Sequence, residues 1–458
     1  MFLTIQLFFN LFMNILLFQN PLKDINTFLF RITLIFLIIS TSLNLYDIFL
    51  FSDNFSIQIF NNSIYINSLI LTQEFILSLI AIFVLITFKN YLFKPETLVL
   101  LIVNLISCHF ILESSNFILL FISWELFNLS LYIIIYNKGD GLKTLASSTK
   151  YFLLSALATN LLLLSLALFY HVTGTLDFQS LIIFFDINYL DPNNISLAFA
   201  TILLISTIMF KLGASPLHFL APDLYDATPI RITFWIANIP KILYLFLLFN
   251  LYHLGLLHSS NSFLLNSDNL LLFFGASSII IGALGLTQQI KIKRFLTYSG
   301  ISNLGYILLT IPFISIFFYN IFIYLIAIIN IFYIIILLQN ISKSEISYIH
   351  QINGLYKHNP FIAIAFSISL FSIAGIPPLP GFFAKYLLLQ LLIDNYHLLF
   401  ISFIIFATMI TVANYIRLLF AINFNIYTQI YSYSHENNSL YLIITFLTTL
   451  LTLFQFIP

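Results

Sequence analysis

Long apolar runs, divided by short polar segments, constrain this 458-residue chain more than any other feature. Many of the runs approach or exceed the roughly 20 residues that span a bilayer as a helix. Only 7% of the residues are charged, whereas an average soluble domain has roughly 25%. So few charges cannot cover the surface of a soluble protein. The sequence therefore predicts an all-α polytopic membrane protein.

Reading the apolar runs between polar segments predicts about fourteen transmembrane helices. The predicted spans are 2–18, 27–46, 67–88, 96–112, 116–136, 147–170, 195–222, 228–252, 269–290, 295–313, 317–341, 360–394, 396–421 and 438–457.

Two of these spans contain Gly/Pro-rich interruptions, GASPLH at 213–218 and GIPPLPG at 375–381. The interrupted spans are the seventh and the twelfth, so they predict two five-helix repeats, and an odd number of helices inverts the second repeat in the membrane. Two unrelated proline kinks are the alternative. The predicted parts are N-terminal helices 1–3 over 1–94, a first repeat (helices 4–8) over 95–253, a second repeat (helices 9–13) over 254–421 and a C-terminal helix over 422–458.

Charges in the connections orient the predicted helices. Connections that carry lysine or arginine alternate with three acidic connections, 46–66, 171–194 and 253–268, which contain neither. The positive-inside rule places the basic connections on the cytoplasmic or matrix side, and both chain ends on the opposite side. Arg231 and Arg417 fall near basic-side helix ends, where we expect their side chains to snorkel to the membrane surface.

Four charged residues fall well inside predicted spans. Glu125 lies near the middle of span 116–136 and Lys241 at the centre of span 228–252. Lys211 comes just before the first interruption and Lys385 just after the second. A charged side chain at the bilayer centre costs about 2.5–3.5 kcal/mol on insertion scales. We therefore expect these side chains in the interior of the bundle, paired or hydrated.

Lysine in such a place is suited to relaying protons. Desolvation favours the neutral amine, whereas a nearby carboxylate favours the ammonium ion. A change in the distance between Glu125 and Lys211 would therefore make the lysine hold or release its proton. A static ion pair between the two is the alternative.

Other polar residues are weaker candidates. Lys150 lies near the basic-side start of its span, where its side chain either snorkels to the membrane surface or takes part in the relay. His218 follows the first interruption; a histidine can shuttle protons near neutral pH, or it can cap a helix. Asp223 and Asp226 are expected to cap helix ends on the basic side. Glu113 is expected to be solvated in a short acidic-side turn.

Several function classes are excluded. The net charge of zero gives no basic surface for nucleic acid. The single cysteine, Cys108, excludes an internal disulfide, a cysteine zinc site and an iron–sulfur cluster. The sequence has no phosphate-binding loop, dinucleotide fingerprint, HExxH motif or nucleophile elbow. No redox cofactor and no metal are therefore expected in this chain.

The interrupted spans resemble the antiporter-like subunits of respiratory complex I and of multisubunit cation/proton antiporters. SPLHFLAPDLYDATP (215–229), preceded by FKLGA, resembles the signature of this family. GIPPLPGFFAKY (375–386) is similar to the chain 2 members, which have a lysine where chain 4 members have a glutamate. TKYFLLSA (149–156) and KIKRFLTYSGISNLGY (291–306) fit as well. The resemblance covers residues 95–420.

The resemblance implies roles for the four buried charges. Glu125 and Lys211 match the coupling ion pair of the family, Lys241 the central relay lysine, and Lys385 the lysine of the second half-channel. It implies a proton-translocating subunit of the membrane arm of NADH:ubiquinone oxidoreductase (complex I). NADH, FMN, iron–sulfur clusters and ubiquinone would be bound by other subunits.

The implied partners are the antiporter-like chain 4, the small membrane-arm subunits and lipids. The heavy use of Phe, Tyr, Ile and Asn is what AT-rich codons produce, as in many organelle genes. The expected location is the mitochondrial inner membrane, with the bacterial plasma membrane as the alternative. A standalone cation/proton antiporter and a structural spacer that only transmits coupling are the competing functions.

Overall fold

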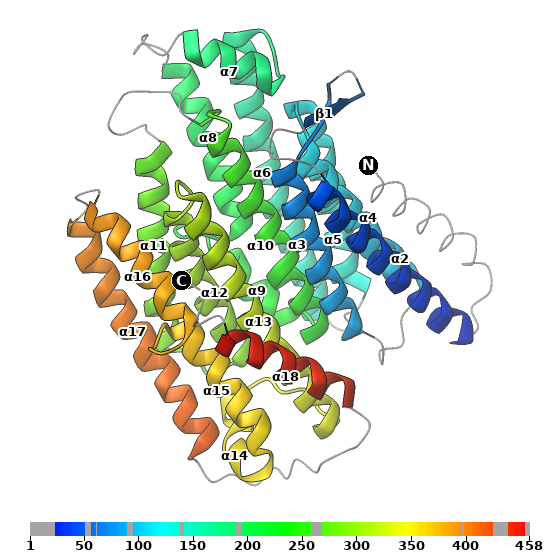
Figure 1. The fold of residues 1–458 in the computed structure, drawn as a ribbon, viewed down its shortest axis with the longest axis vertical. Helices are drawn as coiled ribbons and strands as arrows, with labels where there is room; N and C mark the ends of the chain where they lie inside the picture. Colours follow the sequence, from blue (N-terminus) through cyan, green and yellow to red (C-terminus); the bar gives the residue numbers. More distant parts are fainter. Residues whose placement is uncertain are drawn as a thin grey trace. The chain divides into compact units, whose positions relative to one another are not determined.

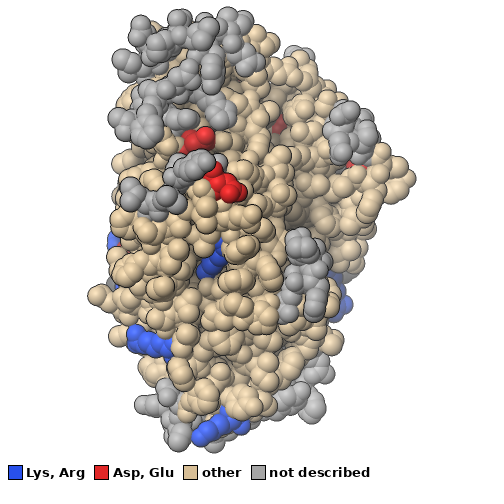
Figure 2. Space-filling view, turned by 60° about the vertical axis from the view of Figure 1, so that its left-hand side comes forward, with Lys and Arg blue, Asp and Glu red and all other residues tan. Residues whose placement is uncertain are grey.

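A computed structural model describes residues 23–50, 56–60, 62–88, 95–137, 142–187, 195–257, 267–394, 398–424 and 438–453. Nearly all of these residues are helical (Figure 1). Within them, nine helices are long and apolar enough to cross a membrane. Charged atoms occupy very little of the surface seen in Figure 2. The chain is a helical membrane protein.

The chain divides into two compact units. Unit 1 comprises Met1–Leu212 and Ala227–Asn269, and unit 2 comprises Gly213–Asp226 and Leu270–Pro458. Unit 1 contains α2 (Lys23–Leu50), β1 (Ser56–Ile59), β2 (Ile64–Asn67), α3 (Ser68–Ile86), α4 (Pro95–Glu113), α5 (Phe117–Asn137), α6 (Leu142–Thr173), α7 (Phe178–Ile187), α8 (Ile195–Leu212) and α10 (Ile230–His253). Unit 2 contains most or all of α9 (Leu220–Ala227), α11 (Ser267–Thr287), α12 (Ile292–Leu309), α13 (Ile314–Ser342), η2 (Ile349–Ile352), α14 (Leu355–His358), α15 (Pro360–Ala374), α16 (Pro380–Asp394), α17 (Leu398–Asn423) and α18 (Asn438–Leu453).

Helix α10 is the most enclosed of the unit 1 helices that the structure describes. It packs against α3, α4 and α8. Every residue in a stretch of α10 long enough to cross a membrane is buried. A helix that is apolar on every side is expected to be surrounded by other helices. In unit 1, α4 also packs on α5, and α6 packs on α5 and α8.

A short β-hairpin and α7 lie at the acidic-side ends of these helices. Strands β1 and β2 pair antiparallel, with Ile57 opposite Ile66. The amide of Ser115, in the turn between α4 and α5, donates to the carbonyl of Ser63 at 3.0 Å. The amide of Phe178 donates to the carbonyl of Ser115, also at 3.0 Å. The segments expected only as connections therefore form structure that covers the α4–α5 turn.

Helix α13 holds the corresponding place in unit 2. In a stretch of α13 long enough to cross a membrane, 94% of the residues are buried. The helix packs against α12, α15, α16 and α18. A separate apolar cluster joins α11, α12, α16 and α17; its buried members are Ile279, Ala283, Tyr306, Leu309, Leu388, Leu392, Ile401, Ile404 and Ala407.

Both predicted interruptions fall where one helix ends and another begins. Helix α8 ends at Leu212 before α9, and α15 ends at Ala374 before α16. The next residues, Gly213 and Gly375, have φ angles of +71° and +78°. Helices often end with a glycine in this left-handed conformation, because it has no Cβ to clash. The two interruptions thus begin in the same way.

Each predicted span from 27–46 to 438–457 coincides with one helix or with the two helices that flank an interruption. Span 2–18 and both chain ends lie outside the described residues. The fourteen crossings, the inverted repeat with its boundaries, and the sidedness of the chain ends stay predictions.

Candidate functional site

The surroundings of Lys211 are built by α5, α6 and α8 of unit 1. Glu125, Asn128 and Tyr132 recur at three- and four-residue spacing, so they share one face of α5. Lys211 lies in the last turn of α8, and its Nζ donates a hydrogen bond of 2.7 Å to Asn128 Oδ1. The same Nζ lies 5.6 Å from the centre of the Tyr151 ring. The ammonium group therefore sits between an amide and an aromatic face.

Asn128 is a site residue that sequence reasoning missed. The hydrogen bond of Lys211 in the described part of the chain goes to this amide, one turn beyond Glu125 on α5. The direct pairing of Glu125 with Lys211 stays a prediction. An asparagine three residues after a glutamate inside an apolar span is the signal that could have identified Asn128.

Two further hydroxyl groups, those of Tyr132 and Ser155, lie near Tyr151. The rings of Tyr132 and Tyr151 meet edge to face at 5.2 Å, and the Tyr132 and Ser155 hydroxyls are hydrogen-bonded to each other. These groups extend the polar surroundings of Lys211 from α5 onto α6.

Lys241 lies in the enclosed helix α10 and is only 6% exposed. Tyr244, one turn further along α10, packs its ring 4.7 Å from that of Trp124, the neighbour of Glu125 on α5. The Trp235 Nε1 atom donates to Asn104 of α4 at 3.0 Å. The helix that carries Lys241 is thus joined by aromatic and polar contacts to α4 and α5.

The side chain of Lys385, in α16 of unit 2, reaches back across the second interruption to the end of α15. Its Nζ donates to the carbonyl oxygens of Ile373 at 3.0 Å and of Ala374 at 2.8 Å, and lies 4.7 Å from the centre of the Tyr306 ring. The last carbonyls of a helix lack intrahelical partners, and the negative end of the helix dipole favours a cation there. The end of α15 is therefore a fitting place for an ammonium group.

Gly375 leaves room for the Lys385 side chain. A Cβ atom on Gly375 would lie 2.7 Å from Lys385 Cδ. A cavity of about 30 Å³ lies beside the lysine and is lined in part by Asn303, Asn320 and Tyr324. This volume is enough for a water molecule, and polar side chains are the partners that such a molecule needs.

The two weaker candidates have different surroundings. Lys150 is exposed on α6. His218 is partly buried in the first interruption, with its ring 6.2 Å from that of Tyr298. Its buried Nδ1 atom makes no hydrogen bond within the described residues. A relay role for either residue stays a prediction.

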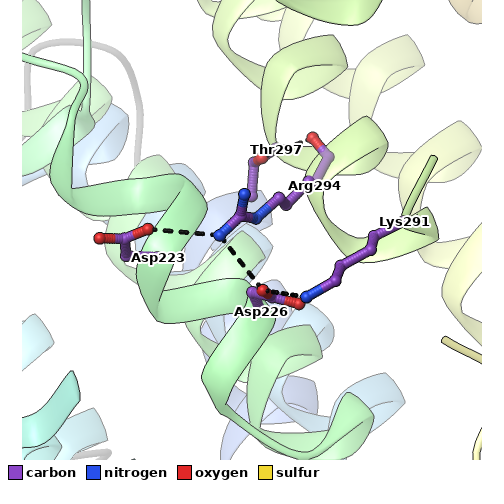
Figure 3. A network of polar contacts seen from close by, with 5 residues as sticks. All are labelled: Asp223, Asp226, Lys291, Arg294 and Thr297. Atoms are coloured by element: carbon purple, nitrogen blue, oxygen red, sulfur yellow. Dashed lines mark hydrogen bonds and ion pairs between the residues drawn. The ribbon is translucent and has the colours of Figure 1, made fainter. Parts of the chain in front are cut away.

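Asp223 and Asp226 form ion pairs instead of simple helix caps (Figure 3). Asp226 Oδ2 lies 2.6 Å from Lys291 Nζ and 3.3 Å from Arg294 Nη2. Asp223 Oδ1 lies 3.6 Å from Arg294 Nη2. All four residues belong to unit 2. Their contacts connect α9, which follows the first interruption, to the start of α12.

Two predictions about charged side chains are wrong. Glu113 was expected in water but is 1% exposed, because β2 pairs with the following residue, Ser114. Arg231 was expected to reach the membrane surface but is 9% exposed, because α10 is enclosed from its first turn. Arg417 is exposed, as expected, and donates to the Thr287 carbonyl at 3.2 Å.

No group of three or more potential metal ligands lies together in the part of the chain that the structure describes. The candidate residues are lysines, a glutamate, an asparagine and tyrosines; of these side chains, lysine, glutamate and tyrosine can act as proton donors or acceptors.

Known proteins resemble the chain in fold and in sequence. A chain of respiratory complex I from Thermus thermophilus, solved with bound aureothin, superposes with a TM-score of 0.81 at 20% identity, covering 100% of this chain and 97% of that one. A chain of the Mrp complex from Dietzia sp. has a TM-score of 0.78 at 20% identity, covering 93% and 80%. At these identities the likeness establishes the fold.

Sequence comparison is more specific. NADH-ubiquinone oxidoreductase chain 2 of Rhizopus oryzae is 32% identical over 330 residues, which cover 69% of this chain and 61% of that relative. The chain thus spans about three fifths of the relative's length. Residues 114–411, about two thirds of the chain, match the transmembrane family of NADH:quinone oxidoreductase and Mrp antiporter subunits. The chain belongs to this NADH:quinone oxidoreductase/Mrp antiporter family.

Proposed function

We propose that this chain is a proton-translocating, antiporter-like subunit of the membrane arm of an NADH:quinone oxidoreductase. The observation that carries the proposal is a lysine at each helix interruption, Lys211 at the end of α8 and Lys385 near the start of α16. Their hydrogen bonds within the described residues go to uncharged oxygens. An uncharged acceptor stabilises an ammonium ion less than a carboxylate does, so such a lysine can release its proton at a lower cost.

In unit 1 the relay comprises Glu125, Lys211 and Lys241. Lys211 takes a proton when the Glu125 carboxylate approaches it, because opposite charges favour the ammonium form. Asn128 holds the Lys211 side chain in place through its 2.7 Å hydrogen bond. Lys241, enclosed in α10, receives the proton next. In unit 2, Lys385 serves the second half-channel, and the cavity beside it can hold water that carries the proton.

The chain would lie beside the other membrane-arm subunits, among them the antiporter-like chain 4 and the small membrane subunits, and would contact lipid. NADH, FMN, iron–sulfur clusters and ubiquinone would be held by other subunits of the complex. Relatives named NADH-ubiquinone oxidoreductase chain 2 and NADH-quinone oxidoreductase subunit N support a mitochondrial inner membrane, with a bacterial plasma membrane as the alternative.

A subunit of a cation/proton antiporter is the second candidate. The fold shared with a chain of the Mrp complex favours it. The lysine at position 385 favours the first candidate, because chain 2 members of the family carry a lysine there. The two differ in their energy source, since an antiporter moves protons against a cation gradient without NADH.

The test is proton pumping by the purified complex in sealed vesicles. Lys211→Met and Lys385→Met remove the charge and keep most of the side-chain volume, and each is expected to lower the protons moved per NADH. Lys357→Met is the matched control, because Lys357 is exposed outside the candidate site. Unchanged pumping by assembled Lys211→Met complex would contradict the proposal and favour a structural spacer. Sodium-driven proton movement without NADH would favour the antiporter.

A further inference from the structure

Three ionisable side chains of unit 1 are buried together outside the site described above. Glu74 of α3 and His109 and Glu113 of α4 are each 1% exposed. His109 Nδ1 lies 3.6 Å from Glu74 Oε2. The carboxyl groups of Glu74 and Glu113 lie within hydrogen-bonding reach of each other. His109 and Glu113 are four residues apart, so both point from one face of α4 toward α3.

The arrangement requires bound protons. Two carboxylates buried side by side repel each other strongly, so one of them holds a proton. Glu74 Oε1 and His109 Nδ1 make no hydrogen bond within the described residues, although both atoms are buried. Buried polar atoms without a hydrogen bond cost free energy. A proton placed between the carboxyl groups or on the imidazole lowers this cost.

The residue before Glu74 is hydrogen-bonded to a residue that lines a cavity. Gln73, the neighbour of Glu74, forms two hydrogen bonds with Asn250 of α10, at 2.7 and 2.9 Å. Asn250 lines a cavity of about 390 Å³. Ile70, one turn before Glu74 on α3, and Ser114, the residue after Glu113, line the same cavity.

The cavity lies at the acidic-side ends of the helices. Besides residues of α3, α4 and the α4–α5 turn, its lining comes from β2, α7 and the end of α10, which border the acidic connections. Glu74 is the seventh residue of α3, so it lies only about 9 Å along the helix axis from the start of α3 at a rise of 1.5 Å per residue.

We propose that Glu74, His109 and Glu113 form a second proton-binding site, which exchanges protons with the acidic side of the membrane through this cavity. One carboxyl group of the Glu74–Glu113 pair keeps its proton throughout. A second proton arriving from water binds the other carboxylate and forms one O–H bond. When this second proton moves from the carboxyl oxygen to His109 Nδ1, it leaves one carboxylate, beside a neutral carboxyl group and an imidazolium ion. No other ionisable group is required; Asn44 of α2 supplies a neighbouring polar group to Glu74.

Proton binding is tested by infrared spectroscopy on the intact complex. Protonated buried carboxyl groups give a carbonyl stretching band that differs from those of carboxylates and amides. We expect Glu74→Gln and Glu113→Gln each to remove the same band, because either substitution removes one member of the shared pair. Glu96→Gln, an exposed position on α4, is the matched control and leaves the band unchanged. Spectra of both variants identical to the wild type would overturn the proposal.

A role in turnover rests on the proposed function and is tested separately. NADH-driven proton movement is expected to fall by a factor of about 100 in Glu74→Gln and in His109→Gln, the low end of proton-transfer effects, and to stay unchanged in Glu96→Gln. Loss of the infrared band with unchanged pumping would show a proton-binding site that the relay does not use, and would overturn the exchange role. Pumping that fails only in the Lys211 and Lys385 variants would support the proposed function alone.

Discussion

The Nζ atom of Lys211 lies 2.7 Å from Oδ1 of Asn128, a residue one turn along α5 from Glu125. The amide therefore binds the Lys211 ammonium group and fixes the position of this side chain against α5. At such a place a small movement of a charged side chain changes the electrostatic energy of the lysine.

Replacing Asn128 by leucine is expected to lower proton pumping about tenfold, because a hydrogen bond to a charged group contributes about 1.5–3 kcal/mol. Vesicle assays of NADH-driven proton movement provide the measurement. Asn160→Leu, at an exposed position of α6, is the control. Equal activity of the two variants would show that the Lys211–Asn128 bond has no part in transport.

Gly375 is expected to be intolerant of alanine for two reasons. Its φ of +78° disfavours any L side chain, and a Cβ would lie 2.7 Å from Lys385 Cδ. Gly255 separates the two effects, since its φ is +77° and a Cβ there would meet nothing within 4 Å.

Both alanine variants are expected to lose about 1–2 kcal/mol of stability from the backbone alone. Only Gly375→Ala is expected to reduce proton pumping as well, because only it displaces Lys385. Thermal unfolding and pumping of the two variants, measured side by side, make the comparison. Equal pumping would mean that the position of Lys385 is not critical.

Gly381 allows the start of α16 to approach α15. A Cβ on Gly381 would overlap the carbonyl oxygen of Ser372, which is backbone and cannot rotate away. Gly381→Ala is therefore expected to impair assembly of the complex, visible as loss of the intact complex on native gels. Gly285→Ala, whose Cβ would first meet the ring of Tyr298, a side chain that can shift, is expected to have a smaller effect.

The ion pair between Asp226 and Lys291 is expected to contribute modestly to stability. Both side chains are partly exposed, at 23% and 36%, and exposed pairs contribute about 0.2–1 kcal/mol. Asp226→Asn should lower the unfolding temperature slightly, and salt should reduce the difference. In a double-mutant cycle, Asp226→Lys combined with Lys291→Asp should recover part of the loss. A loss that salt leaves unchanged would point to another role for Asp226.

The sequence was sufficient to place the long apolar helices of the described residues because a membrane allows few alternatives. Hydrophobic length determines where a helix can cross, and Gly213 and Gly375 mark where two helices end. The lysines at 211, 241 and 385 could be singled out because a charge inside an apolar span is costly. These features depend on residues close together in the chain.

The missed features depend on contacts between distant segments. Gln73 and Asn250 pair across 177 positions, and no local pattern indicates this partnership. Glu113 appeared solvated because the sequence around it reads as a turn, whereas β2 covers that turn through a bridge from Ile64 to Ser114. The strands of the hairpin are four residues each, too short for a periodic signal.

The enclosure of α10 bears on the order in which unit 1 assembles. Its neighbours in this unit, α3, α4 and α8, all precede it in the chain. During synthesis they are therefore inserted before α10 emerges. A helix with a lysine at its centre can then leave the insertion machinery directly into a groove between existing helices, so that Lys241 need not face lipid at any stage.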